Sequence, residues 1–232
     1  MMRCALKAVR LSAGIGGIIS LLVVGSPGVR WDPAASVSLS SGKKAYAQSP
    51  GALLRYRVVP ERSEARYLVR EQLAGLSFPN DAVGTTSAIQ GSIVLDAQGR
   101  VLPSESRFTV DLRTLRSDEA RRDNYLRRNT LETDRNPNAV FVPTEARGLP
   151  IPLPQTGTAS FDLVGDLTIR DTTRRITWEA TATIQGQDLG VQARTAFRFA
   201  DFGLRIPRVA SVLSVEDTIR LEIDLLLGRS PS

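Results

Sequence analysis

The stretch SDEARRDNYLRR, residues 117–128, decides the fold because it is the one helical segment in a chain that otherwise alternates like β-strand. Ser117 is its expected N-cap, and an acidic residue follows at Asp118. Arg127 and Arg128 end it, which suits the negative end of the helix dipole. We predict a short helix with an exposed polar face, inserted into an all-β chain.

Segments on both sides of this helix alternate apolar and polar residues with a period of two. This pattern is typical of strands with one buried face and one solvent-exposed face. Short turns separate most of them, so neighbouring strands are expected to run antiparallel. The expected strands cover residues 54–58, 65–69, 89–95, 106–112, 139–145, 159–169, 176–184, 191–199 and 219–227.

Eight or nine such strands can close into an antiparallel barrel or form a two-sheet sandwich. The barrel explains the small residues on the inward faces better, because an eight-stranded barrel is just wide enough for side chains or one slender ligand. The alternative is that these residues fit the taper of a filled interior. The small inward residues are Ala65, Gly91, Ala159, Gly165, Ala180, Ala182 and Ala193.

Residues 1–47 read as an export leader, and residues 48–232 as the folded domain. The leader has basic residues, then the apolar stretch 11–24, and then the small-x-small sequence 45–47 before a cleavage point. We therefore expect an exported protein, periplasmic, extracellular or in the cell envelope, with retention of residues 11–24 as a membrane anchor as the alternative.

The net charge of +6 does not indicate a nucleic-acid-binding protein. Six of the 30 basic residues but only one of the 24 acidic residues lie in residues 1–47, so the remaining domain is nearly neutral. Its arginines are dispersed among acids and form no basic face with interleaved aromatic residues.

Three residue types are absent from the expected domain. The chain has no histidine, its single cysteine is Cys4, and all its lysines precede residue 48. The domain therefore lacks an imidazole base, a thiolate, a disulfide and a Schiff-base lysine. No carboxylates have the spacing of a glycosidase pair or a calcium loop, and no phosphate-binding loop is present. We expect no catalysis, no metal and no cofactor.

Several short motifs follow one another in a distinctive order and spacing. They are Arg122, Asp123 and Leu126, then Pro137 and Phe141, then Val164–Thr168 with Arg174–Thr177, and finally Asp201–Gly203. In these motifs the chain resembles, from Tyr56 to Leu227, the YceI-like family of polyisoprenoid-binding, lipocalin-like proteins. The resemblance implies a lipocalin-like β-barrel of about eight strands, with a long apolar cavity for a polyisoprenoid chain.

We therefore expect a binding protein that encloses a long isoprenoid lipid, of polyprenyl or quinone type, as a carrier or sequestering module. Membrane proximity would follow from the leader or from lipid exchange, and the sequence defines no oligomeric state. We expect ligand-binding residues that line the cavity among the side chains that alternation places on the inward faces of the strands. They are Tyr67, Phe78, Ile93, Phe108, Phe161, Leu163, Leu167, Trp178, Ala180, Ala182, Phe197 and Ile223.

Two alternatives to this function remain, and the motif Arg122–Asp123 has two interpretations. The first alternative is a membrane-tethered structural or interaction domain with a filled core, and the second is a carboxylate-based hydrolase. Arg122 and Asp123 either attach the helical insert to the barrel by buried hydrogen bonds or lie near a ligand head group.

Overall fold

The computed structural model of the protein describes residues 53–75, 77–208 and 212–230, which belong to one compact unit. The expected leader, residues 1–47, lies outside these residues. The elements are β1 (Leu54–Val58), η1 (Pro60–Arg62), β2 (Glu64–Leu73), β3 (Asn80–Thr86), β4 (Ile89–Leu95), β5 (Arg107–Asp111), η2 (Leu112–Thr114), β6 (Arg116–Ser117), α1 (Ala120–Tyr125), η3 (Leu126–Thr130), β7 (Asn138–Arg147), β8 (Thr156–Ile169), β9 (Thr172–Gln185), β10 (Asp188–Phe197), η4 (Phe199–Phe202) and β11 (Val212–Ser230).

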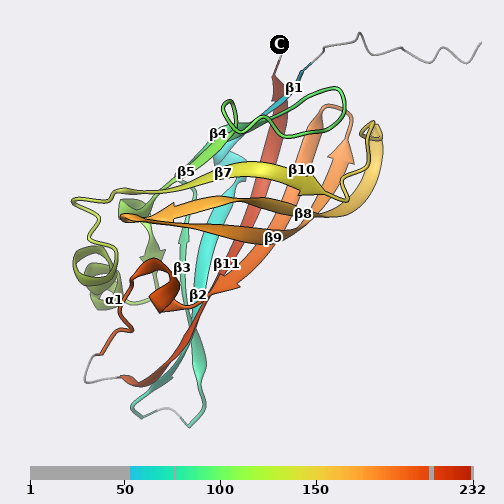
Figure 1. Cartoon of the computed structure of the whole chain (residues 1–232). Helices are drawn as coiled ribbons and strands as arrows, with labels where there is room; N and C mark the ends of the chain where they lie inside the picture. Colours follow the sequence, from blue (N-terminus) through green and yellow to red (C-terminus); the bar gives the residue numbers. More distant parts are fainter. Residues whose placement is uncertain (1–52, 76, 209–211, 231–232) are drawn as a thin grey trace, which may run out of the picture. The chain divides into compact units, whose positions relative to one another are not determined.

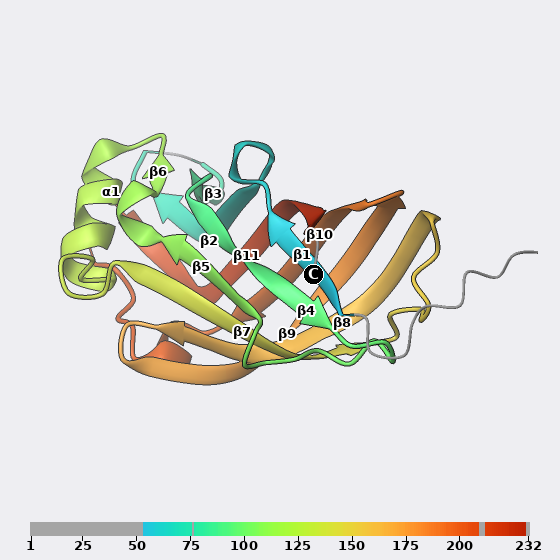
Figure 2. The ribbon, with the colours of Figure 1, turned by 90° about the horizontal axis from the view of Figure 1, so that it is seen from above.

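The strands form one antiparallel sheet that closes on itself (Figures 1 and 2). Neighbouring strands follow the order β1-β4-β5-β7-β8-β9-β10-β11, and β11 then pairs with β1 from Val58↔Leu227 to Arg55↔Ser230. β2, β3 and β6 continue the lines of β1, β4 and β5, so the wall has eight strands. The predicted all-β class, the barrel and the single helical insert are confirmed, and a two-sheet sandwich is excluded.

The long strand β11 holds β1 and β2 in line although η1 interrupts them. Ser63 is 5 % exposed at this break. Its Oγ donates a hydrogen bond to the Val59 carbonyl at 2.8 Å and accepts one from the Leu226 amide at 3.1 Å. The side chain thereby satisfies backbone groups of the β1–β2 bend and of β11.

The core lies inside the barrel because successive side chains of each strand point to opposite faces. In β9, Trp178, Ala180, Ala182 and Ile184 are buried, whereas Glu179 between them is exposed. β9 pairs with β8 from Thr156↔Gln185 to Ile169↔Thr172 without a register shift. In β8 and β9 the side chains that point into the barrel are therefore the ones that the alternation of the sequence predicts.

The helical insert begins at Ala120 and continues as η3 to Thr130, so it starts and ends later than the predicted residues 117–128, and Ser117 is not its N-cap. α1 begins at Ala120, after Glu119, whose carboxylate accepts a hydrogen bond from the Arg121 amide at 2.9 Å. Ser117 instead belongs to β6 and pairs with Gly84 of β3. The cap prediction was wrong because an additional strand pairing, which the local sequence does not reveal, takes up Ser117.

Candidate functional site

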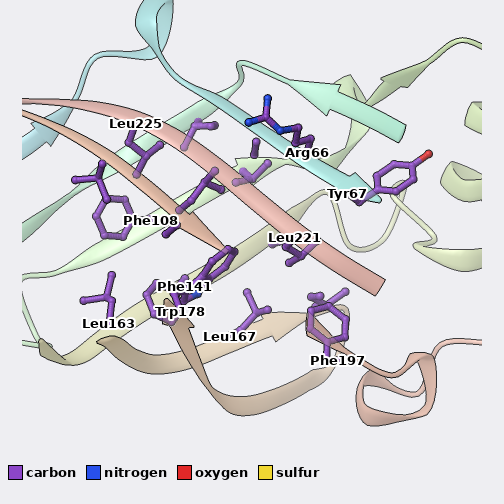
Figure 3. Close-up of a pocket in the computed structure, with 18 of the residues that line it drawn as sticks. Arg66, Tyr67, Phe108, Phe141, Leu163, Leu167, Trp178, Phe197, Leu221 and Leu225 are labelled. Carbon is purple, nitrogen blue, oxygen red and sulfur yellow. The ribbon is translucent and has the colours of Figure 1, made fainter. Parts of the chain in front are cut away.

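The barrel encloses an apolar cavity of about 220 Å³. This volume is far larger than the roughly 10–15 Å³ that a single water needs. Its walls carry inward side chains from every strand line, and Figure 3 shows Phe108, Leu163, Leu167 and Trp178 around the same space. An open interior of this size disfavours the filled-core alternative.

Ten of the twelve residues predicted to line the cavity do so. They come from seven different strands, so the closed sheet brings together positions up to 156 residues apart in the chain. They share one property: the alternation of apolar and polar residues in each strand predicts that their side chains point into the barrel. The ten are Tyr67, Ile93, Phe108, Phe161, Leu163, Leu167, Trp178, Ala182, Phe197 and Ile223.

The other two predicted residues, Ala180 and Phe78, lie elsewhere. Ala180 is 5 % exposed within the wall, where it pairs with Phe161 and Ala193, but it does not line the cavity. The prediction for Phe78 was wrong, because its side chain is 80 % exposed. Phe78 belongs to the turn of the β2–β3 hairpin, which carries it away from the interior.

The small inward residues divide into two groups. Ala65, Ala182 and Ala193 line the cavity and leave it open. Gly165 instead makes room for an aromatic ring, because a Cβ at this position would lie 2.6 Å from Cζ of Phe141. Gly91 has a φ of +139°, and a Cβ there would lie 2.7 Å from the Phe108 Cα. The taper interpretation therefore applies to the glycines, and the cavity interpretation to these alanines.

Residues from the connections close the two ends of the cavity, and the sequence analysis did not identify them. At the end near α1 the lining includes Leu126, Leu131 and Leu204, and at the opposite end Leu149 and Leu153. The last two belong to the proline-rich β7–β8 connection. Its leucines could have been noticed as apolar side chains without a strand to bury them, but their direction depends on tertiary structure.

The described lining presents no charged group to the cavity. Arg66 contributes to the wall, but its guanidinium forms ion pairs with Glu64, Glu222 and Asp224 and lies away from the apolar groups in Figure 3. Burial raises the pKa of the Tyr56 hydroxyl, and burial raises the pKa of Tyr67 to about 12. Both phenols are therefore neutral at neutral pH, which keeps the wall uncharged.

Two buried polar atoms of the described wall residues have no hydrogen-bond partner, the Tyr67 hydroxyl and the Trp178 indole Nε1. Trp178 is 5 % exposed. The ring lies 6.1 Å from Phe141, centroid to centroid, in an edge-on arrangement. This contact places a bulky aromatic pair in the wall next to Gly165, which accommodates Phe141.

Arg122 and Asp123 lie at the junction of α1 with the barrel and do not line the cavity. The Arg122 guanidinium binds the Glu71 carboxylate at 2.7 Å, and Glu71 is 7 % exposed. The Asp123 carboxylate accepts hydrogen bonds from the Ser117 amide at 3.0 Å and the Ser117 hydroxyl at 2.7 Å. These contacts favour the interpretation that the pair attaches the insert to the barrel.

Within the described ranges, no group of three or more acidic side chains could hold a metal ion. The cavity has an apolar wall, neutral phenols and one indole donor. Such a site can remove a hydrocarbon from water, and its described lining contains no carboxylate.

These features define a lipocalin-like barrel with an enclosed apolar cavity. The YceI-like domain model matches residues 56–227, so the chain belongs to the YceI-like family.

Two curated relatives illustrate the match at the sequence level. A UPF0312 protein of Pseudomonas putida (strain W619) is 31 % identical over 137 residues, which are 55 % of this chain and 66 % of the relative. A UPF0312 protein of Pseudomonas fluorescens (strain SBW25) is 30 % identical over 151 residues, 61 % of this chain and 71 % of the relative. The match thus spans slightly less than two thirds of the P. putida protein.

Solved structures share the fold at low sequence identity. A polyisoprenoid binding domain from Saccharophagus degradans, implicated in plant cell wall breakdown, superposes with a TM-score of 0.61 at 13 % identity, over 76 % of this chain and 99 % of that one. BcnA of Burkholderia cenocepacia gives 0.55 at 15 % identity, over 73 % and 98 %. The YceI protein of Campylobacter jejuni gives 0.52 at 17 % identity, over 69 % and 91 %.

A search of the described residues for membrane-spanning helices finds none of sufficient length and hydropathy. The apolar stretch 11–24 lies outside these residues.

Proposed function

We propose that this protein binds a long isoprenoid lipid, of polyprenyl or quinone type, and encloses its hydrocarbon chain in the barrel cavity. The single observation that carries the proposal is the apolar cavity of about 220 Å³, which extends from the β7–β8 connection to η3 and η4. Each CH₂ group that leaves water for such a wall contributes roughly 0.8 kcal/mol to binding. Membership of the YceI-like family and the polyisoprenoid binding domain among the structural neighbours support the same ligand class.

The absence of charge on the cavity wall restricts where a head group can lie. A phosphate or pyrophosphate moved into this interior without a partner would lose its hydration and gain no ion pair. The head group of a polyprenyl phosphate therefore stays at the mouth, in contact with water. A neutral quinone ring can enter further, because it carries no charge.

The role we propose is that of an extracytoplasmic carrier or sequestering protein without enzymatic activity. Support for the location comes from residues 1–47, whose basic, apolar and small-x-small segments have the order of an export leader. Support for binding without chemistry comes from the domain's lack of histidine, cysteine and lysine.

The direct test is to purify the protein from cells, extract it with organic solvent and identify the released lipid by mass spectrometry. Ala182→Phe places a ring in the cavity from β9, and we expect this variant to carry several-fold less isoprenoid lipid. Thr183→Phe is the matched control, because the neighbouring Thr183 is exposed on the outer face of the same strand.

Two results would contradict the proposal. One is a purified protein without isoprenoid lipid, whose melting temperature no prenyl ligand raises. The other is equal lipid content in Ala182→Phe and Thr183→Phe, because lipid bound on the outer surface would not respond to a cavity-filling ring.

A further inference from the structure

Part of the sheet projects beyond the barrel at the α1 end. β10 ends its pairing at Phe197↔Ile219, but β11 begins seven residues earlier, at Val212, and pairs there with Leu73 of β2. The β2–β3 hairpin extends in the same direction, and its last described pair is Glu71↔Asn80. The start of β11 and the end of the hairpin therefore form a ribbon with β10 no longer beside it (Figure 1).

This ribbon and the segment before it carry most of the exposed large apolar side chains of the described residues. Phe78 is 80 % exposed in the hairpin turn, Leu213 is 68 % exposed at the start of β11, and Ile206 is 38 % exposed after η4. The fourth, Ile151, belongs to the opposite end of the barrel. Clustered exposed apolar residues on a soluble domain mark an interaction surface.

The register places Phe78 and Leu213 close to one another on the ribbon. Val212 pairs with Leu73, the last residue of β2, and Leu213 is the next residue of β11. Leu213 therefore lies near the outer end of β2. Glu71 and Asn80 form the last described pair of the hairpin, and Phe78 lies two residues beyond Asn80 toward the turn. The two most exposed apolar side chains thus belong to the outer ends of strand lines on either side of β2.

At the outer end of the ribbon the charges have one sign, and the exposed acids of β11, Glu216 and Asp217, lie nearer the barrel. Residues 72–79 contain no charged side chain, and residues 204–215 contain Arg205 and Arg208 but no acid. Both arginines are exposed, and no described side chain forms an ion pair with them. An aromatic tip flanked by unneutralised arginines has the composition of a protein surface that enters the interface of an anionic bilayer.

The surface adjoins the cavity. Leu204 is 7 % exposed and lines the cavity, and the next two residues, Arg205 and Ile206, are exposed. Ile219 of β11 also lines the cavity, six residues or roughly 20 Å of strand from Leu213. A bilayer in contact with the ribbon would therefore lie next to the η4 end of the cavity.

We propose that Phe78, Leu213 and Ile206, together with Arg205 and Arg208, form a docking surface for anionic phospholipid bilayers, which we call the docking tip. The apolar side chains enter the bilayer interface and the arginines lie among the lipid phosphates. Its use as the place of lipid exchange rests on the proposed function, but binding of the tip to vesicles does not.

The test uses the full chain with Cys4→Ser and one new cysteine, which carries an environment-sensitive fluorophore. Phe78→Cys and Leu213→Cys report on the docking tip, and Ile151→Cys reports on the opposite end. Since all three proteins have the same residues 1–47, any binding by the leader is common to them. Vesicles contain phosphatidylcholine alone or with about a third phosphatidylglycerol, and brominated acyl chains detect insertion.

We expect quenching at positions 78 and 213 with anionic vesicles only, and little at position 151. Arg205→Glu with Arg208→Glu should lower the vesicle affinity of the label at 78 by at least roughly tenfold, because each arginine near an anionic surface contributes about a factor of five. The matched control is Arg57→Glu with Arg62→Glu, two exposed arginines of β1 and η1, which should leave the affinity unchanged. Raising the salt concentration should weaken the quenching.

Equal quenching at positions 78 and 151, or none at 78, would overturn the proposal. So would a dimer in light scattering that Phe78→Ser dissociates, because the docking tip would then be covered by a second copy of the chain. The lipid content of the purified protein is measured separately, so vesicle docking by a protein without bound lipid would contradict the proposed function but not the docking tip.

Discussion

Tyr67 shows how one residue adapts to the cavity wall. It belongs to β2, lies opposite Gly84 of β3, and its ring occupies the space that a Cβ at Gly84 would need. A larger residue at position 84 would displace the ring. The same arrangement recurs at Phe141 and Gly165, so two aromatic side chains of the wall each lie against a glycine of the neighbouring strand.

The buried hydroxyl of Tyr67 makes stability depend on alkaline pH. Its pKa is about 12 in the folded protein, against about 10 in an unfolded chain. Between these values the unfolded chain has released the proton and the folded protein retains it. The free energy of unfolding therefore falls as pH rises through this window, by up to about 1.4 kcal/mol per pH unit, and is unaffected well below pH 10.

Tyr67→Phe should remove this part of the alkaline decline. Urea unfolding between about pH 9 and about pH 11 measures it, and the domain's lack of lysine leaves tyrosine as the main group that titrates there. Tyr56→Phe is the comparison, because burial also raises the pKa of Tyr56. A decline of the same slope in Tyr67→Phe as in the wild type would contradict the assignment.

The helical insert depends on a few polar contacts with the barrel. α1 has six residues, too few to be stable alone. Arg122 connects it to Glu71 of β2, and Asp123 connects it to Ser117 of β6. Arg122 also forms an ion pair with Asp118 one turn earlier in the chain, and Asp123 accepts hydrogen bonds from both the amide and the hydroxyl of Ser117.

Arg122→Met should lower the free energy of unfolding by about 3 kcal/mol, because it leaves the buried carboxylate of Glu71 without its partner. Hydrogen exchange should increase in residues 115–131 more than in β8 and β9. Adding Glu71→Gln should restore part of the loss. Arg121→Met, an exposed neighbour in the same helix, is the control.

The comparison of stability with binding separates the two interpretations of Arg122. An attachment role predicts that prenyl-ligand affinity changes less than stability. If Arg122→Met instead kept its melting temperature and lost affinity, Arg122 would belong to a head-group site.

At the scale of the whole molecule, closure of the sheet gives the cavity a definite length. Its lining ends at Leu149 and Leu153 on one side and at Leu126, Leu131 and Leu204 on the other. Each added part of a ligand chain contributes binding free energy only if it is buried against the cavity wall, so the part that extends beyond the cavity contributes none.

We therefore predict that the affinity of prenyl alcohols rises with each added isoprene unit and then becomes constant when the chain fills the cavity. Isothermal titration calorimetry with a series of increasing chain length measures this dependence. Each increment should carry a more negative heat-capacity change until the plateau, because apolar area is buried. A steady rise without a plateau would indicate adsorption to an outer surface, contrary to enclosure.

Much of the wall could be predicted from the local sequence. Alternation along β8, β9, β10 and β11 identified the inward faces, and with them most of the residues that line the cavity. Phe78 shows the limit of this reasoning, because its segment has no period and its direction depends on the hairpin that β2 and β3 form. The leucines of the β7–β8 connection escaped notice for the same reason.

The sequence by itself determined the all-β class, the helical insert, the side chains of each strand that point inward, and the absence of histidine, cysteine and lysine from the domain. All of these follow from residue type and from a period of two, which are local properties. Only the tertiary structure decided that the sheet closes through β1 and β11, that Arg122 meets Glu71, that alanines rather than glycines keep the cavity open, and that Phe78 lies outside. These depend on pairings between residues far apart in the chain, whose register no local pattern specifies.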